Sequence, residues 1–317
     1  MTLPTVRAHR LAEQPQARRW LIDELWADEA VGIVGGEPKC CKSFLALDMA
    51  VAVAGGVPCL RRFAAAQTGR VLLFAAEDAL HVVRQRLASI ALAAGRVLDD
   101  LDIHVITVPS VRLDVERDRD ALTATVDALR PKLLVLDPFV RMHRIDENLS
   151  GEVAPLLAYL RELQRRFHVA VVLVHHARKG AAKMRAGQAL RGSSDFHAWG
   201  DSNLYLRRQG EQLVLSVEHR AAAAITAVSL ELTIAGDAVA LAALDRAAAT
   251  TGVAVITAPI TLADKIAAQL EAAASPLTAA ALRKLCKVRN ATLTLALTDL
   301  VATGRVRKDA TGYVVAR

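Results

Sequence analysis

The segment that most constrains the fold joins a short apolar run to a helical stretch through a glycine-containing turn. The run Val31–Val34 leads through Gly35 into Gly36–Ser43, and an Ala/Leu-rich stretch then continues to Ala54. Four buried-strand residues followed by a turn and a strong helix-former sequence predict a strand, a loop and a helix in immediate succession. This arrangement is typical of α/β domains with a parallel sheet.

Gly36–Ser43 has the pattern of a phosphate-binding loop (P-loop) with one departure. The pattern requires Gly, four residues, then Gly-Lys followed by Ser or Thr, and Cys41 stands where the second glycine belongs. Lys42 would reach the β- and γ-phosphates, and the Ser43 hydroxyl would bind Mg²⁺. We therefore predict ATP and Mg²⁺ as cofactors. The predicted nucleotide-binding residues are Gly36, Glu37, Pro38, Lys39, Cys40, Cys41, Lys42, Ser43 and Phe44.

Cys41 bears on hydrolysis more than on binding. The second glycine position often requires a positive φ, which costs a residue with a Cβ atom about 1–2 kcal/mol. Lys42 and Ser43 predict that the loop binds ATP, whereas Cys41 leaves the rate of hydrolysis open.

Further apolar runs alternate with helical stretches along the chain. Continuous Val/Leu runs are typical of parallel strands buried on both faces, and the later alternating runs suit an antiparallel extension at the sheet edge. The expected parallel strands are Val71–Phe74, Ile103–Val108, Leu133–Leu136 and Val169–Val174, with helices His81–Ala94, Asp120–Leu129 and Glu152–Phe167. The expected edge strands are Leu204–Leu206, Leu213–Val217, Val228–Leu232 and Ala238–Ala243.

Composition supports this fold class and indicates the cellular compartment in which the protein is expected. Hydrophobic residues make up 53% of the chain but aromatic residues only 4%, so the core must consist mainly of Ala, Val and Leu. The four cysteines form no CxxC pair, no apolar run reaches the length of a membrane span, and no secretory signal is visible. We expect a reduced, cytoplasmic protein without a membrane partner.

Two carboxylates are placed to serve the phosphate loop. Asp137 closes the buried strand Leu133–Leu136 and would hold Mg²⁺ together with Ser43, on a strand expected next to the P-loop strand. Pro138 follows it, so the water-activating carboxylate must come from elsewhere. Glu77 ends the strand Val71–Phe74 and is the candidate general base. The alternative is that Glu77 or Asp78 caps the next helix, a role expected for Asp78.

These features together resemble the RecA-like ATPases, and among them the RepA-type hexameric replicative helicases and related bacterial AAA-family ATPases. The matching segments are Gly35–Leu47, Glu77-Asp78, Asp137–Asn148, Val174–Lys179 and Arg191–Arg208. The resemblance implies that Glu77 is the catalytic glutamate and that His175 or His176 senses the γ-phosphate. It also implies that Arg220 is an arginine finger reaching into a neighbouring subunit of a homo-oligomer, with a hexamer expected. Arg207 or Arg208 could take that role instead, and Arg220 could be a plain surface residue.

The same resemblance implies a DNA-binding loop after the histidines. In RecA-like rings the loop that follows the sensor strand lines the central channel and contacts single-stranded DNA. Basic side chains suit sequence-independent phosphate contact, although a solvated loop is the alternative. The residues are Arg178, Lys179, Lys183 and Arg185.

The C-terminal segment has its own pattern. We expect a RecA-like ATPase domain over residues 1–246, a linker over 247–260 and a winged-helix domain over 261–317. Nine basic and four acidic residues between Leu262 and Arg317 give +5 of the chain's formal charge of +7. The expected helices are Leu262–Ala273, Thr278–Cys286 and Asn290–Thr303, followed by a hairpin around Thr311-Gly312. Phosphate contact suits Lys287, Arg289, Arg305, Arg307 and Lys308, although winged helices also bind proteins.

Three functions compete at this point. The leading hypothesis is an ATP-hydrolysing, ring-forming, DNA-handling motor. The second is an ATP-controlled DNA-binding switch or loader that does not unwind DNA. A small-molecule kinase is disfavoured because the sequence has no lid of clustered arginines.

Overall fold

The structure is a computed structural model that describes residues 3–11, 20–176, 195–223, 225–244, 266, 269–270, 273, 276–286, 290–303, 305–309 and 312–315. It divides into two compact units, Met1–Asp245 and Arg246–Arg317, each of which is described by itself.

The larger unit is built on a nine-stranded sheet. The strand order is β11-β10-β9-β8-β3-β7-β6-β4-β5, with the five strands from β8 to β4 and the edge strand β5 all parallel and β9, β10 and β11 antiparallel. The mostly parallel sheet with an antiparallel edge is confirmed. The strands are β3 (Val31–Gly36), β4 (Val71–Ala75), β5 (Ile103–Val105), β6 (Leu133–Asp137), β7 (Ala170–His176), β8 (Ser202–Gln209), β9 (Gln212–His219), β10 (Val228–Ala235) and β11 (Ala238–Ala243).

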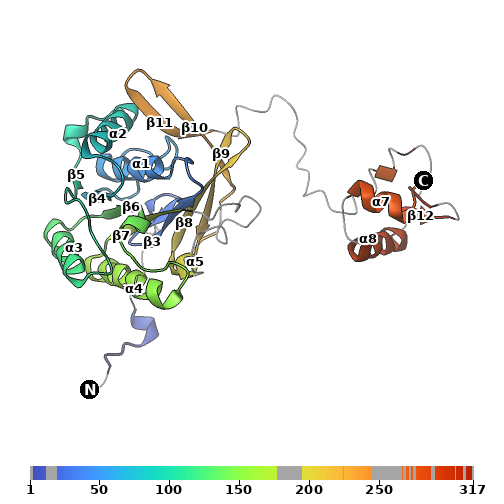
Figure 1. Ribbon diagram of the computed structural model, residues 1–317, viewed down its shortest axis with the longest axis horizontal. Helices are drawn as coiled ribbons and strands as arrows, with labels where there is room; N and C mark the ends of the chain where they lie inside the picture. Colours follow the sequence, from blue (N-terminus) through green and yellow to red (C-terminus); the bar gives the residue numbers. More distant parts are fainter. Residues whose placement is uncertain are drawn as a thin grey trace. The chain divides into compact units, whose positions relative to one another are not determined.

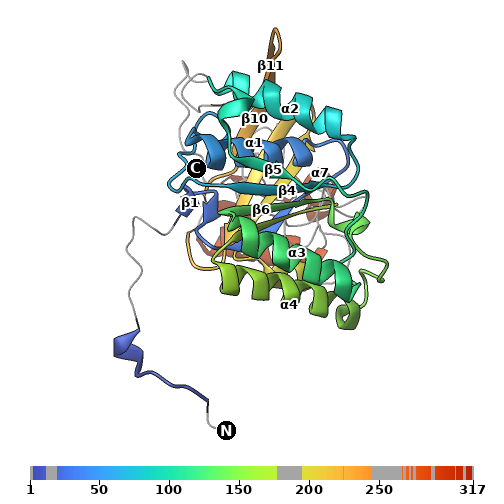
Figure 2. The ribbon, with the colours of Figure 1, turned by 90° about the vertical axis from the view of Figure 1, so that its left-hand side faces the viewer.

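Helices cover both faces of this sheet (Figures 1 and 2). In Figure 2 helices lie both above and below the sheet. Above it are α1 (Lys42–Gly55) and α2 (Leu80–Ala93), and below it are α3 (Glu116–Leu129), α4 (Ser150–Phe167) and the short α5 (Asp195–Trp199). The shorter elements are η1 (Ala8–Arg10), β1 (Trp20–Ile22), β2 (Trp26–Ala27), η3 (Leu98–Asp100) and η4 (Phe139–Arg141).

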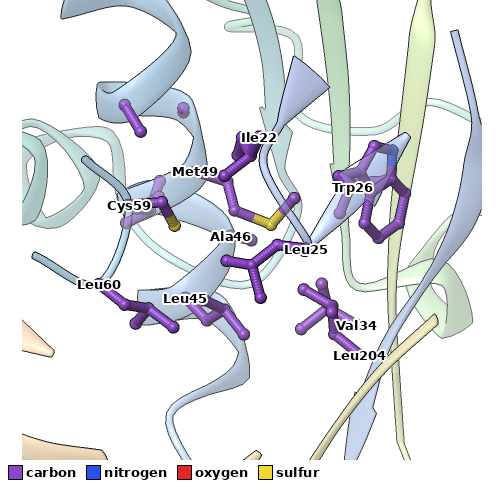
Figure 3. Close-up of a cluster of buried hydrophobic side chains, with 14 of the residues drawn as sticks. Ile22, Leu25, Trp26, Val34, Leu45, Ala46, Met49, Cys59, Leu60 and Leu204 are labelled. Atoms are coloured by element: carbon purple, nitrogen blue, oxygen red, sulfur yellow. The ribbon is translucent and has the colours of Figure 1, made fainter. Parts of the chain in front are cut away.

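The core between α1 and the sheet contains mainly aliphatic residues, as the composition predicted. Figure 3 shows Leu45 and Met49 of α1 facing Val34 of β3 and Leu204 of β8. Trp26, whose indole N–H donates to the Ala30 carbonyl (3.2 Å), lies at the end of this layer. Helix α1 therefore packs along the strand that carries the phosphate loop, and this packing fixes where its N-terminus lies.

The smaller unit contains α7 (Ala279–Cys286), α8 (Asn290–Ala302) and an antiparallel hairpin of β12 (Val306–Lys308) and β13 (Tyr313–Val315). Its core includes Leu282 of α7, Leu297 of α8 and Val306 of β12. Within the described part of the chain, none of the helices has both the length and the apolar character needed to cross a membrane.

Candidate functional site

The phosphate loop lies where the sequence predicted, between β3 and α1. Gly36 ends β3, and a Cβ atom there would lie 2.3 Å from the Leu206 carbonyl oxygen and 2.7 Å from the Cys40 sulfur. A residue other than glycine would therefore displace the neighbouring strand or the loop. The five residues between Gly36 and α1 form a tight turn that ends at the helix N-terminus, a site that favours anions.

Lys42 points back into the loop. Its Nζ atom donates a hydrogen bond to the Glu37 carbonyl (2.8 Å) and lies 4.0 Å from the Cys40 sulfur, which itself donates to the same carbonyl at 2.7 Å. Burial lowers the pKa of Lys42, and the thiol of Cys40 and the carboxylates of Asp137 and Glu77 act in the opposite direction. Burial raises the pKa of the Cys40 thiol. The ammonium group thus occupies the loop that phosphate oxygens would enter.

Asp137 and Ser43 come together at the mouth of this loop. The Ser43 hydroxyl lies beside the Asp137 carboxyl group and acts to lower its pKa, and Asp137 is only 8% exposed. Burial raises the pKa of Asp137 to about 6, and the nearby charges of Asp78 and Glu77 add to the increase. Two hard oxygen ligands beside a phosphate loop fit Mg²⁺, which usually takes one or two protein ligands together with phosphates and water.

The lateral position of the Asp137 strand differs from the expectation. We expected the strand that carries Asp137 to lie directly beside the P-loop strand, but β7 separates β6 from β3. The apolar pattern of a buried strand gives its place in the chain and not its place in the sheet, so the sequence could not supply this order.

A measurable consequence concerns the stability of the nucleotide-free protein. Between pH 3.8 and about 6 the folded chain keeps the Asp137 proton that the unfolded chain releases, so stability falls as pH rises through this window. Asp137→Asn should abolish this slope and raise the free energy of unfolding at pH 7 by about 3 kcal/mol. Urea unfolding without Mg²⁺ and nucleotide measures it. Asp127→Asn, at an exposed carboxylate, is the control and should keep the slope. If Asp137→Asn also keeps it, the assignment of the slope to Asp137 is wrong.

Cys41 has the backbone conformation that the motif predicts for a glycine. It precedes α1 with φ 64° and ψ 26°, in the left-handed region that disfavours a Cβ atom. Cys41→Gly should therefore raise the free energy of unfolding by about 0.5–1 kcal/mol, after the entropy that glycine adds to the unfolded chain is subtracted. Thermal or urea unfolding provides the measurement. Lys39 has φ 62° in the same loop, so Lys39→Gly should raise the free energy of unfolding by a similar amount. A loss of stability in both variants would show that the positive φ angles do not strain the loop.

Glu77 lies beyond the end of β4, beside the Asp137 strand. Its Oε1 atom accepts a hydrogen bond from Nε of Arg141 at 2.8 Å. Asp78 does not cap the following helix as expected: Ala79 is the N-cap residue without a side-chain cap, and Asp78 pairs with Arg86 instead. Arg141 was missed by sequence reasoning. The sequence shows only that Arg141 comes four residues after Asp137. Asp137 ends β6, the strand that pairs with β4, and Glu77 follows β4.

The two histidines that end β7 face opposite sides of the sheet. His175 is buried and stacks on Phe196 (4.5 Å between ring centroids), with Phe139 edge-on at 6.1 Å. His176 pairs in register with Gly36 and continues the alternation of Val172 and Val174, which pack with α1. Of the pair, His176 is therefore on the side of the phosphate loop, and His175 belongs to the aromatic core below the sheet.

Arg220 follows β9 at the end of the sheet opposite the phosphate loop. Its guanidinium group pairs with Asp201 (3.2 Å) and donates to the carbonyls of Ala198 and Trp199. Asp201 in turn is hydrogen-bonded to Val31, the first residue of β3. The phosphate loop begins at Gly36, the last residue of the same strand. Five residues of strand span about 16 Å, so Arg220 cannot reach the phosphate site of its own chain.

The other predicted arginines and the basic residues are distributed as follows. Arg207 and Arg208 follow Leu206, which pairs with Gly36, so they lie at the phosphate-loop end of the sheet. Arg305, Arg307 and Lys308 are exposed in the smaller unit. The remaining predicted DNA contacts lie outside the described residues, namely Arg178, Lys179, Lys183, Arg185, Lys287 and Arg289. The expected linker and most of the helix Leu262–Ala273 also lie outside them.

Comparison with known proteins gives one family and several similar folds. Residues 1–182 match the family described as AAA domain. A DnaB-like replicative helicase has a TM-score of 0.52 at 14% identity, over 67% of this chain and 57% of that one. A RadB recombinase (TM-score 0.48, 16% identity, 69% and 92% of the two chains) and a KaiC-like protein from Pyrococcus horikoshii (0.47, 14%, 71% and 94%) are also similar. The likeness to the DnaB-like replicative helicase shows that the two chains share a fold.

Proposed function

The chain belongs to the AAA domain family and has the fold of a RecA-like P-loop ATPase, and from this premise we propose that it is a ring-forming, DNA-handling motor driven by ATP hydrolysis. Within that class, the pattern of its motifs favours the RepA type of replicative helicase. DNA as the partner is carried over in part from the DnaB-like replicative helicase that shares the fold. The expected assembly is a hexamer.

One observation carries the ATPase part of this proposal. Three neighbouring features meet at the carboxyl ends of the parallel strands: the Lys42 loop after β3, the Asp137–Ser43 pair at the end of β6, and Glu77 after β4. Both Asp137 and Glu77 act to raise the pKa of Lys42, which supports a shared site. A cation for the phosphates, ligands for Mg²⁺ and a carboxylate for the water are the parts that hydrolysis requires.

Each residue then has a role that its position supports. Lys42 and the loop N–H groups bind the β- and γ-phosphates, and Ser43 and Asp137 would hold Mg²⁺, which would supply positive charge to the phosphates. Glu77 orients and deprotonates the attacking water. His176, rather than His175, is the γ-phosphate sensor, because it lies on the phosphate-loop side of β7.

The test of the motor is DNA-stimulated hydrolysis followed by strand separation. Purified protein should hydrolyse ATP faster with single-stranded DNA, and Lys42→Ala should abolish the activity because the phosphates lose their cation. Sedimentation with and without nucleotide should show a larger assembly with ATP. Hydrolysis without displacement of a forked duplex would contradict the helicase and leave the second function.

That second function is an ATP-controlled DNA-binding switch or loader. Cys41 favours it, because a strained residue in the loop is compatible with slow hydrolysis and long-lived binding. The basic smaller unit favours it as well: two helices and a hairpin with exposed Arg305, Arg307 and Lys308 are compatible with a winged helix that contacts DNA phosphates. Loss of DNA affinity in the triple alanine variant at these positions, with hydrolysis retained, would support that contact.

A further inference from the structure

Arg141 forms an ion pair with the proposed catalytic carboxylate from a firmly anchored position. It is the last residue of η4, the single turn that follows Asp137. Phe139 in the same turn is fully buried, and the Met142 carbonyl accepts a hydrogen bond from the Leu113 N–H at 2.7 Å. The backbone on both sides of Arg141 is therefore fixed, while its side chain is 63% exposed.

The pair is unsuited to holding the fold together. Its two side chains are 63% and 43% exposed, and exposed ion pairs contribute little to folding because water and salt screen them. Phe139 and the strand pairing of β4 with β6 already fix the two elements that it joins. The contact instead concerns one atom of functional interest, Oε1 of Glu77.

We propose that Arg141 is a positioning residue that restrains Glu77 and thereby slows ATP hydrolysis, an inference that rests on the proposed function. The Arg141 N–H, 2.8 Å from Oε1, occupies one acceptor position of the Glu77 carboxylate and restricts its orientation, so an attacking water molecule must compete with the guanidinium group for it. Hydrolysis proceeds only in the fraction of molecules in which Glu77 is released. A weak, solvent-exposed pair suits this role, because it opens readily.

The test compares Arg141→Ala with two other variants. An exposed pair of this kind shifts an equilibrium by about two- to fivefold, so Arg141→Ala should raise kcat by about that factor at unchanged KM, and Arg141→Lys should restore the wild-type rate in part. Arg130→Ala is the matched control: Arg130 pairs with Asp127 at almost equal exposure (64% and 46%) on another part of the surface, and its removal should leave kcat unchanged. An unchanged kcat, a fall in kcat, or a rise in KM for Arg141→Ala would overturn the proposal, the last two because they assign Arg141 to catalysis or phosphate binding.

A spectroscopic measurement separates failure of this inference from failure of the proposed function. In ¹⁵N-labelled, nucleotide-free protein, the Nε–H signal that disappears in Arg141→Ala should shift in Glu77→Gln, whether or not the chain hydrolyses ATP. An unshifted signal would overturn the restraint. A shifted signal in a protein that does not bind ATP would instead contradict the proposed function alone.

Discussion

Replacing Glu77 with glutamine is expected to lower kcat for ATP hydrolysis by about 100- to 10,000-fold, the usual contribution of a general base, with little change in ATP affinity. Glutamine keeps the shape of the side chain and an oxygen that can accept the Arg141 N–H, so the strand ends should stay in place. Only the ability to accept a proton from water is lost. Single-turnover hydrolysis and binding of a fluorescent ATP analogue measure the two effects separately.

Asp78 provides the matched control for this variant. It is the adjacent carboxylate, and its pairing with Arg86 directs it toward α2. Asp78→Asn should therefore change kcat much less than Glu77→Gln. If the two variants lose equal activity, or if Glu77→Gln loses less than about tenfold, the general base is not Glu77.

Arg220→Ala is expected to lower kcat by about 1,000-fold or more, the effect of removing an arginine finger. Because Arg220 lies about 16 Å along the strand from the phosphate loop of its own chain, it can serve hydrolysis only in another copy. The decisive measurement is therefore made on mixtures. Lys42→Ala retains Arg220, and Arg220→Ala retains an intact loop, so an equimolar mixture should complete up to about a quarter of the interfaces at random.

Recovery of activity in that mixture is the specific result. Two variants that are each inactive because they are damaged should remain inactive together. Arg207→Ala and Arg208→Ala are useful comparisons, because these residues lie at the other end of the sheet, beside Gly36. If one of them shows complementation with Lys42→Ala and Arg220→Ala does not, the finger is assigned to the wrong arginine.

Most elements of the larger unit could be predicted, because their residues carry strong local patterns. The apolar runs that became β3, β4, β6 and β7 are continuous, and Gly36, Lys42 and Ser43 form a motif with fixed spacing. Element ends were less accurate. The strand expected to end at Val108 ends at Val105, and the helix expected to start at Asp120 starts at Glu116, since end positions depend on hydrogen bonds to other segments.

The parts that sequence could not supply depend on contacts between distant segments. Nothing in the pattern around Arg141 indicates that it faces Glu77, because the two meet only through the pairing of β4 with β6. Alternation along a strand predicts that His175 and His176 face opposite sides, but the side with the phosphate loop is known only once α1 is placed. The ion pair between the buried Asp48 and Arg61 was missed for the same reason.

The contact between Arg220 and Asp201 has a thermodynamic consequence for assembly. In the single chain the Asp201 carboxylate takes the place of an anion from outside: it pairs with both Arg220 and Arg161 and also accepts the Val31 N–H. To contact a phosphate of a neighbouring subunit, Arg220 must leave the Asp201 carboxylate. Subunit association therefore exchanges one ionic partner for another, and its free energy gains only the difference between the two interactions. The high negative charge of a triphosphate can make the new interaction more favourable than the pair with Asp201, whereas an empty site offers no such interaction. In the proposed assembly, the strength of the subunit contact would then depend on the bound nucleotide, and the contact would weaken after each hydrolysis.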